Sequence, residues 1–285
     1  MTHRKSPSWS SSLLRRDLSA RAHHLASTQK LLHDICPGSA PVVIFGRDEE
    51  EGRHGNFHPK SYANICANPA WLRRLTKVHT ASRRSRARKD WQWMELDSCN
   101  SSDALLMNIF CHPGVFNGTA LTPAVANLLN IEPATRPCFG INPGVPLLNG
   151  HLDRTEIDLQ LGNLFLEAKL TESNFQTAKT ALIERYRDLE IVFDIARLPH
   201  SNTGATQGYQ LIRNVLAAFA SDASFCVLCD TRRHDLIEIW YSVLSAVHSR
   251  TFATHLKLLT WQELATILPK DLQHFLEEKY GILPA

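Results

Sequence analysis

The chain has 285 residues, a formal net charge of +3 and an isoelectric point near 8.5, and 44% of its residues are hydrophobic. This length and composition predict a globular protein with a sizeable buried core. The apolar runs fall well short of the roughly 20 residues that cross a bilayer, so we expect a cytoplasmic protein without a membrane partner. The mild positive charge permits a polyanionic partner without requiring one.

The cysteines carry no sign of a disulfide framework or of a zinc site. They are seven in number, their spacing is scattered, and no secretory signal is recognisable before them. We therefore expect free thiols in a reducing cytosol. Cys226 and Cys229 lie in an apolar strand without a second cysteine pair, and we interpret both as core residues.

The first 30 residues are rich in Ser, Arg and His, and Asp17 is their only acidic residue. This composition is typical of a transit peptide or of a disordered basic tail, and we predict the tail. Residues 31–90 are expected to form a mainly helical and looped region. Within it we predict a short helix over residues 31–36, a strand over 41–45, a charged loop over 47–55 and a helix over 61–66.

Residues 73–89 contain the densest basic run, and tryptophans stand on both sides of it. Basic and aromatic side chains together neutralise phosphates and stack on bases, although such runs also occur as solvated loops. We predict that this run contacts nucleic acid. The residues predicted to bind nucleic acid are Arg73, Arg74, Arg83, Arg84 and Arg86.

A buried helix is predicted over residues 104–111, which are apolar on nearly all sides. Ser101 or Ser102 suits its N-cap, and the Pro113-Gly114 dipeptide ends it. A further short helix is expected over residues 122–129, and a first core strand over 138–141.

Residues 155–171 (TEIDLQLGNLFLEAKLT) are the most informative segment of the chain. Two alternating apolar runs flank Gly162-Asn163, a dipeptide suited to a two-residue hairpin turn. Side chains alternate along a strand, so Glu167 and Lys169 share one face, and the hairpin register brings Asp158 near Glu167. An ordinary cross-strand ion pair on a surface hairpin is the alternative.

This Asp, Glu-x-Lys pattern resembles the PD-(D/E)xK (restriction-endonuclease-like) nuclease superfamily over about residues 95–230, although Ile157 replaces the proline of its name. The resemblance implies that Asp158 and Glu167 hold Mg²⁺ or Mn²⁺ and that Lys169 assists the attacking water or stabilises charge at phosphorus. It also implies that Glu95 joins the metal site and that Gln210 points into the active site. A surface carboxylate and an exposed glutamine are the alternatives.

Downstream, we predict a helix over residues 175–189, a strand or helix end over 190–195, and a clear helix over 208–220. Gln207, Gln210 and Asn214 share one face of that clear helix. Strands over 224–229 and 255–259 alternate with helices over 232–248, 261–268 and 272–280. His58, His112 and the other histidines lack a metal-binding spacing, and serine-hydrolase and P-loop motifs are missing.

The fold class we predict is α/β, with a restriction-endonuclease-like core over residues 91–285, in which helices flank a mixed central sheet. The function we predict is a metal-dependent endonuclease or exonuclease, acting on DNA in preference to RNA, with a homodimer as a candidate assembly. The first alternative is a nucleic-acid-binding or assembly module of the same fold without turnover. A second alternative is a small-molecule enzyme that uses the same carboxylates.

Overall fold

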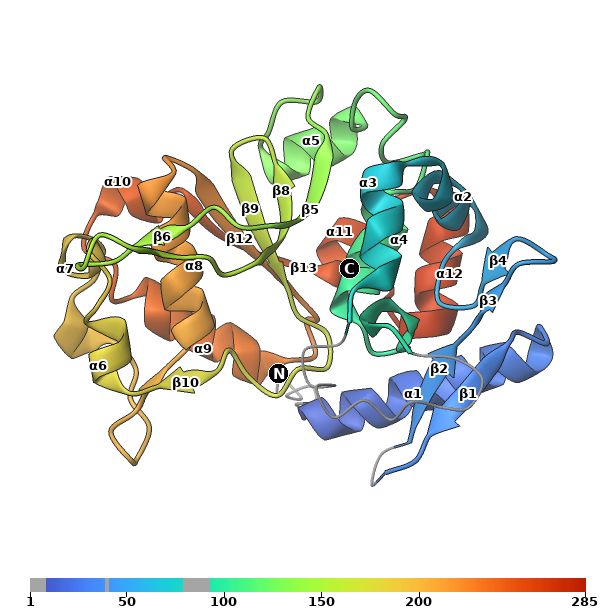
Figure 1. Cartoon of the computed structure of the whole chain (residues 1–285), viewed down its shortest axis with the longest axis horizontal. Coiled ribbons are helices and arrows are strands. Elements are labelled where there is room, and N and C mark those ends of the chain that lie inside the picture. Colours follow the sequence, from blue (N-terminus) through green and yellow to red (C-terminus); the bar gives the residue numbers. More distant parts are fainter. Residues whose placement is uncertain (1–8, 39–40, 79–92) are drawn as a thin grey trace, which may run out of the picture. The chain divides into compact units, whose positions relative to one another are not determined.

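The computed structural model describes residues 9–38, 41–78 and 93–285. The chain folds into two compact units (Figure 1). One, here called the sheet unit, is built mainly from Gly140–Trp261. The other, here called the split unit, combines Ser12–Phe139 with Gln262–Ala285. Within the described residues, no helix is both long enough and apolar enough to cross a membrane.

The sheet unit contains a five-stranded mixed sheet in the order β13-β12-β9-β8-β5. Strands β9, β12 and β13 run parallel, whereas β8 and β9 are antiparallel. Strand β9 therefore has a neighbour on each side, and all five of its residues are buried. The bounds are β5 (Pro137–Ile141), β8 (Ile157–Leu161), β9 (Leu164–Ala168), β12 (Ser224–Cys229) and β13 (Leu256–Thr260).

The predicted hairpin is confirmed. Strand β8 ends at Leu161 and β9 begins at Leu164, and these two residues pair directly across the turn. Gly162 has φ of +60°, a conformation that glycine adopts without strain at the first central position of a type II′ turn. This turn fixes the register on which the position of Asp158 depends.

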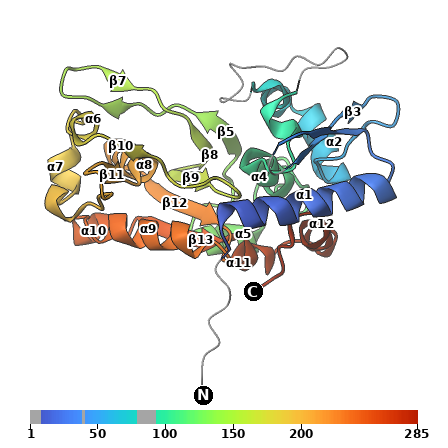
Figure 2. The same ribbon diagram turned by 90° about the horizontal axis from the view of Figure 1, so that it is seen from below.

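Helices and short strands complete the sheet unit. Helix α8 (Tyr209–Ala220) packs against β12, β6 and α9 (Figures 1 and 2). Its apolar face joins a core that includes Phe165, Phe225 and Trp240. The remaining bounds are β6 (Val145–Pro146), β7 (Leu152–Asp153), β10 (Thr177–Ala178), α6 (Thr180–Ile183), α7 (Leu189–Val192), β11 (Thr206–Gln207), α9 (His234–Leu244) and α10 (Arg250–Ala253). Helix α11 (Trp261–Ala265) begins at the last residue of this unit and continues into the split unit.

The split unit is mainly helical. Helix α4 (Ser102–Phe110) is buried from Asp103 to Phe110, as its sequence predicts, and Ser101 caps it by accepting from the Ala104 amide at 3.1 Å. The remaining bounds are α1 (Ser11–Thr28), β1 (His33–Cys36), β2 (Val42–Phe45), β3 (Arg47–Asp48), β4 (Arg53–His54), α2 (Pro59–Ala67), α3 (Pro69–Leu72), α5 (Pro123–Leu129) and α12 (Lys270–Tyr280), with 3₁₀ turns at Arg73–Thr76 and Glu95–Asp97.

The prediction of a disordered tail is wrong for residues 11–28, which form α1. Leu14, Leu18, Ala22 and Leu25 recur at three- to four-residue spacing and bury one stripe of this helix. Burial of that stripe stabilises the helix although its mean hydropathy is low. The division of the chain into an N-terminal region that ends at residue 90 and a nuclease-like core that follows it remains a prediction.

Three further local predictions differ from the structure. Residues 33–36 form a strand paired with β2. The helix predicted there is wrong, because a short apolar run does not distinguish helix from strand. The charged loop over residues 47–55 contains the paired strands β3 and β4. The helix predicted over residues 175–189 is broken, because Gln176 has φ of +61° and β10 pairs with β11.

Candidate active site

Asp158 and Glu167 lie opposite each other at the end of the β8–β9 hairpin. The strand register pairs Leu159 with Leu166, which places Asp158 across from Glu167 one step further along. Asp158 Oδ2 also accepts a hydrogen bond from the Ala168 amide at 2.8 Å. Directly opposed residues of an antiparallel pair point to the same face. The two carboxylates therefore share one face of the sheet.

The carboxylate of Glu167 is almost fully buried, with 1% of the residue exposed. Its Oε1 accepts from Lys169 Nζ at 2.7 Å and from Gln210 Nε2. Its Oε2 accepts from Asn214 Nδ2 at 2.8 Å. Burial of a charge is costly unless the charge is paired and hydrogen-bonded, and these donors meet that requirement.

Lys169 is held by its backbone as well as by its side chain. Its amide donates to Leu228 O at 2.8 Å, and its carbonyl accepts from the buried Trp261 indole at 2.9 Å. The Nζ atom lies 5.6 Å from the centre of the Phe175 ring. These contacts fix the direction of the lysine relative to the strand, so that the ammonium lies on the Glu167 side.

Lys169 is protonated in this environment. Burial by itself lowers its pKa, but the negative charges of Glu167, Glu172 and Asp158 outweigh burial and raise the pKa above the ordinary lysine value. A lysine with a raised pKa is a poor general base near neutral pH. The raised pKa of Lys169 therefore favours charge stabilisation and water orientation by its ammonium over proton abstraction.

Asn214 and Glu172 were not selected as site residues from the sequence. Asn214 follows Gln210 by four residues, so both amides point from one face of α8 toward Glu167. That shared face was visible in the sequence, and it is the signal that could have identified Asn214. Glu172 accepts from the Leu170 amide at 2.6 Å, and its charge raises the pKa of Lys169. Its position depends on loop geometry, which no periodic pattern in the sequence reveals.

The donor set of this cluster fits a hard divalent cation. Mg²⁺ is commonly held by one or two carboxylates together with waters and substrate phosphates. Asp158 and Glu167 supply two carboxylates on one face, and the Lys169 ammonium already places a positive charge against Glu167. An added cation would share Glu167 with that ammonium or displace it.

Three other predicted site residues, Glu95, Arg73 and Arg74, lie in the split unit. The carboxylate of Glu95 pairs with Lys77 at 3.2 Å, and its predicted role at the metal remains a prediction. Arg74 pairs with Asp103 at 2.8 Å. Arg73 begins a 3₁₀ turn. Arg83, Arg84 and Arg86 lie outside the described residues, so the predicted basic surface remains a prediction as well.

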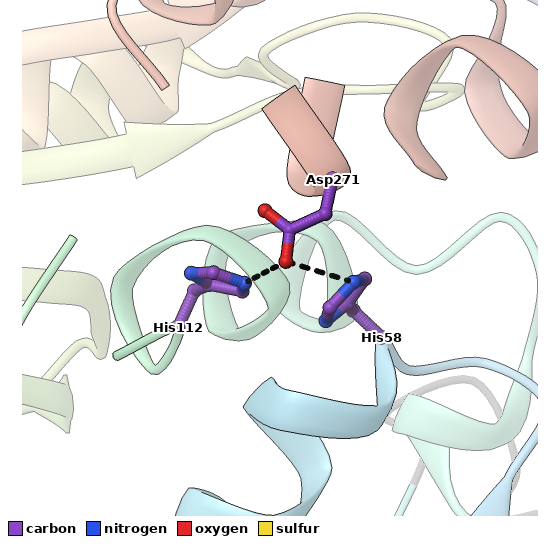
Figure 3. Close-up of side chains that lie close together, drawn as sticks. All are labelled: His58, His112 and Asp271. Carbon is purple, nitrogen blue, oxygen red and sulfur yellow. Dashed lines mark ion pairs between the residues drawn. The ribbon is translucent and has the colours of Figure 1, made fainter. Parts of the chain in front are cut away.

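Two histidines that lack a metal-binding spacing in the sequence meet in the split unit (Figure 3). His112 Nε2 and His58 Nε2 lie 3.5 and 4.0 Å from Asp271 Oδ2. One ligand atom from each residue falls within 4.8 Å of the others, which is compact enough for a metal ion. The three residues come from chain segments that are far apart, so no local motif could have predicted the group.

The backbone contacts of the two histidine rings do not favour a metal. His112 Nδ1 accepts from the Gly114 amide at 3.0 Å, and His58 Nδ1 accepts from the Lys60 amide at 3.3 Å. Burial lowers the pKa of both rings, that of His112 to about 4, so both are neutral. Each neutral ring then carries its proton on Nε2, whereas a metal bound there requires the lone pair. The Asp271 carboxylate instead accepts from Lys60 Nζ at 2.6 Å, and the two rings lie beside it without a hydrogen bond to it.

These features define a mixed α/β protein whose central sheet carries two carboxylates and a lysine on one face. A family model described as "Restriction Endonuclease associating with ARP" matches residues 21–281. The chain belongs to this family, and the predicted restriction-endonuclease-like membership is confirmed. No curated protein and no solved structure gave a significant match. Family membership indicates a nuclease-like role.

Proposed function

We propose that this protein is a metal-dependent nuclease that hydrolyses phosphodiester bonds, with DNA favoured over RNA. The observation that carries the proposal is the buried contact of 2.7 Å between Lys169 and Glu167, with Asp158 opposite Glu167 on the neighbouring strand. Membership in a restriction-endonuclease family supports the same reaction class.

In this proposal Asp158 and Glu167 hold Mg²⁺ or Mn²⁺. The bound cation supplies Lewis-acid polarisation of the phosphate and lowers the pKa of a water ligand. Lys169 keeps its proton, donates to the attacking water or to a phosphate oxygen, and stabilises the negative charge that develops there. Gln210 and Asn214 hold Glu167 in one orientation, so that its carboxylate is positioned before substrate arrives.

The finer predictions extend this proposal. Glu95 is a candidate third carboxylate for the metal. Arg73, Arg74, Arg83, Arg84 and Arg86 form a candidate nucleic-acid surface. A restriction-endonuclease-like core, a homodimer and a cytoplasmic location remain part of the hypothesis. The family description also speaks of an association with ARP, and we extend that association to this chain.

A second function is supported by the hydrogen bonds that both carboxylate oxygens of Glu167 already accept. Its two oxygens already accept from Lys169, Gln210 and Asn214, as expected of a carboxylate with a structural role. On this alternative the protein is a nucleic-acid-binding or assembly module that does not cleave. The intact Asp158, Glu167 and Lys169 set favours cleavage, because a binding module has no need of all three.

The deciding experiment incubates purified protein with Mg²⁺ or Mn²⁺ and linear, circular, single-stranded and structured nucleic acids. Lys169→Met is compared with Lys179→Met, a control at an exposed lysine of the same unit. Circular dichroism establishes that the variants are equally folded. We expect cleavage by wild type and by Lys179→Met, and its loss in Lys169→Met. Binding without cleavage by wild type in every condition would establish the non-cleaving module instead.

A further inference from the structure

Arg213 on α8 is a buried cation with few partners. It is 9% exposed, and its Nε is buried without a hydrogen bond. Its guanidinium carbon lies 5.3 Å from the centre of the Tyr209 ring. Among the described residues, no carboxylate lies within ion-pair distance of Arg213. A buried charge without a counter-ion is unfavourable, so this side chain requires an explanation.

Asp153, a carboxylate whose pKa the charge of Arg213 lowers, has other partners. Asp153 accepts from the Tyr186 hydroxyl at 2.6 Å and from the Thr155 hydroxyl at 2.7 Å, and Arg185 lies 3.5 Å away. Burial raises the pKa of Asp153, but these hydrogen bonds and the charges of Arg213 and Arg185 lower it overall. The carboxylate is therefore ionised, and one negative charge faces two guanidinium groups.

The position of Arg213 on α8 connects it to the carboxylate–lysine cluster. Gln210 and Asn214 both donate to Glu167, and Arg213 stands three residues after the first and directly before the second. Residues three and four apart are neighbours on a helix surface. One turn of α8 therefore presents the amides that hold Glu167 and, on the adjoining face, a cation without a carboxylate partner.

We propose that Arg213 binds a phosphate group of the nucleic-acid backbone beside the carboxylate–lysine cluster. The identity of the ligand as nucleic acid rests on the proposed nuclease function. The existence of an anion site at Arg213 is independent of that function. A guanidinium offers two parallel N–H donors to phosphate oxygens, which a lysine cannot reproduce. The Tyr209 ring makes a cation–π contact with the guanidinium, which leaves the side chain less freedom before the phosphate arrives.

The first test uses inorganic phosphate as the probe. Thermal unfolding of wild type, Arg213→Met, Arg213→Lys and Arg187→Met is followed in phosphate and in chloride at equal ionic strength. Arg187 is a matched surface control, since it already pairs with Asp188 at 2.8 Å. A ligand that binds only the folded state raises its melting temperature.

We expect phosphate to stabilise wild type and Arg187→Met, to leave Arg213→Met unchanged, and to stabilise Arg213→Lys less than wild type. In chloride, Arg213→Met should melt at or above the wild-type temperature, because it removes a charge that lacks a counter-ion. Should Arg213→Met fail to fold, Arg213→Lys carries the comparison. Equal phosphate stabilisation of wild type and both Arg213 variants overturns the site, as does a lack of stabilisation of wild type.

The second test separates this inference from the proposed function. Binding of a short fluorescent DNA duplex is measured by anisotropy without divalent metal, over a range of salt. Loss of one charge-assisted contact should weaken the affinity of Arg213→Met about tenfold and reduce the salt slope by about one. If wild type cleaves nothing while phosphate stabilisation still depends on Arg213, the nuclease proposal fails and the anion site stands. If wild type cleaves and Arg213→Met binds DNA and phosphate as wild type does, the anion site fails alone.

Discussion

Glu167 lies on β9 and Lys169 directly follows the last residue of that strand, and the ammonium donates to the carboxylate at 2.7 Å while both side chains are buried. The lysine thus forms an ion pair with the most buried carboxylate of the cluster. The pair couples folding to chemistry, because each partner is a proposed site residue and also the counter-ion of the other.

Breaking this pair should destabilise the protein. Lys169→Met leaves a buried carboxylate without its counter-ion, and Glu167→Gln leaves a buried ammonium in the same state. We expect each to lower the free energy of unfolding by about 3–5 kcal/mol. The double variant should lose less than the sum of the two, which urea denaturation of all four proteins measures. Strict additivity would show that the two side chains act independently.

Magnesium binding should respond to the same lysine. Its ammonium occupies Glu167 Oε1 and repels an incoming cation, so Lys169→Met should bind Mg²⁺ more tightly than wild type while losing cleavage. Asp158→Asn should lose Mg²⁺-dependent thermal stabilisation, and Asp222→Asn, at an exposed aspartate of the same unit, should keep it. Isothermal titration gives the affinities. Stabilisation of Asp158→Asn equal to that of wild type would remove Asp158 from the metal site.

The two amides on α8 should differ in their contribution. Asn214 is 1% exposed and donates to Glu167 Oε2 at 2.8 Å, whereas Gln210 is only partly buried. A hydrogen bond to a buried charged group contributes about 1.5–3 kcal/mol. We therefore expect Asn214→Ala to lower the free energy of unfolding by that amount and Gln210→Ala by less. Equal losses in both variants would show that burial does not set the strength of these contacts.

Lys279 should make stability rise with pH. It is buried in the split unit, donates to Gly55 O at 2.9 Å, and lies 4.1 Å from the centre of the Phe45 ring. Burial lowers its pKa from 10.5 to about 7, with a small opposing effect from Cys99. The unfolded state therefore binds more protons between these values, and stability falls as pH drops from 10.5 toward 7.

The check is denaturation of wild type and Lys279→Met at pH 7 and pH 10. Methionine keeps most of the volume and removes the buried charge, so the variant should be more stable than wild type at pH 7. Its advantage should shrink at pH 10, where the lysine is neutral in the folded protein. A constant difference between the two proteins at both pH values would mean that Lys279 does not titrate in this range.

Gly208 should be required at the start of α8. It has φ of +71°, and a Cβ there would lie 2.9 Å from Val243 Cγ2. Gly208→Ala should cost about 1–3 kcal/mol from backbone strain and overpacking together. Gly204→Ala is the matched control, because Gly204 has φ of +77° and open space around it. Thermal unfolding should show the larger loss at Gly208, and equal losses would assign the whole cost to the backbone.

The central elements were predictable because each one has a strong local pattern. The alternating runs around Gly162 predict the hairpin, its turn and the shared face of Asp158 and Glu167, and the structure contains that register. The apolar face of residues 208–220 predicts α8 for the same reason. Periodicity over many residues left little choice between helix and strand at these places.

The remaining features depend on contacts between distant segments. Residues 33–36 became a strand because Val42–Phe45 pairs with them. His58, His112 and Asp271 converge from segments that are far apart in the chain, and no spacing rule connects them. The burial of Lys169 could not be predicted from the sequence either, since it depends on contacts with Phe175 and Trp261, which follow it in the chain.

The split unit has a consequence for how the chain folds as it is synthesised. Its N-terminal segment ends at Phe139, and its last segment begins at Gln262, after the whole sheet unit has been made. Helix α12 contributes the buried Leu272, Leu276 and Tyr280, so the core of the split unit is incomplete until these residues leave the ribosome. Domains generally fold as units when their residues become available. The sheet unit can therefore assemble first, and the N-terminal helices remain partly exposed to chaperones and proteases until α12, which is translated after the sheet unit, becomes available.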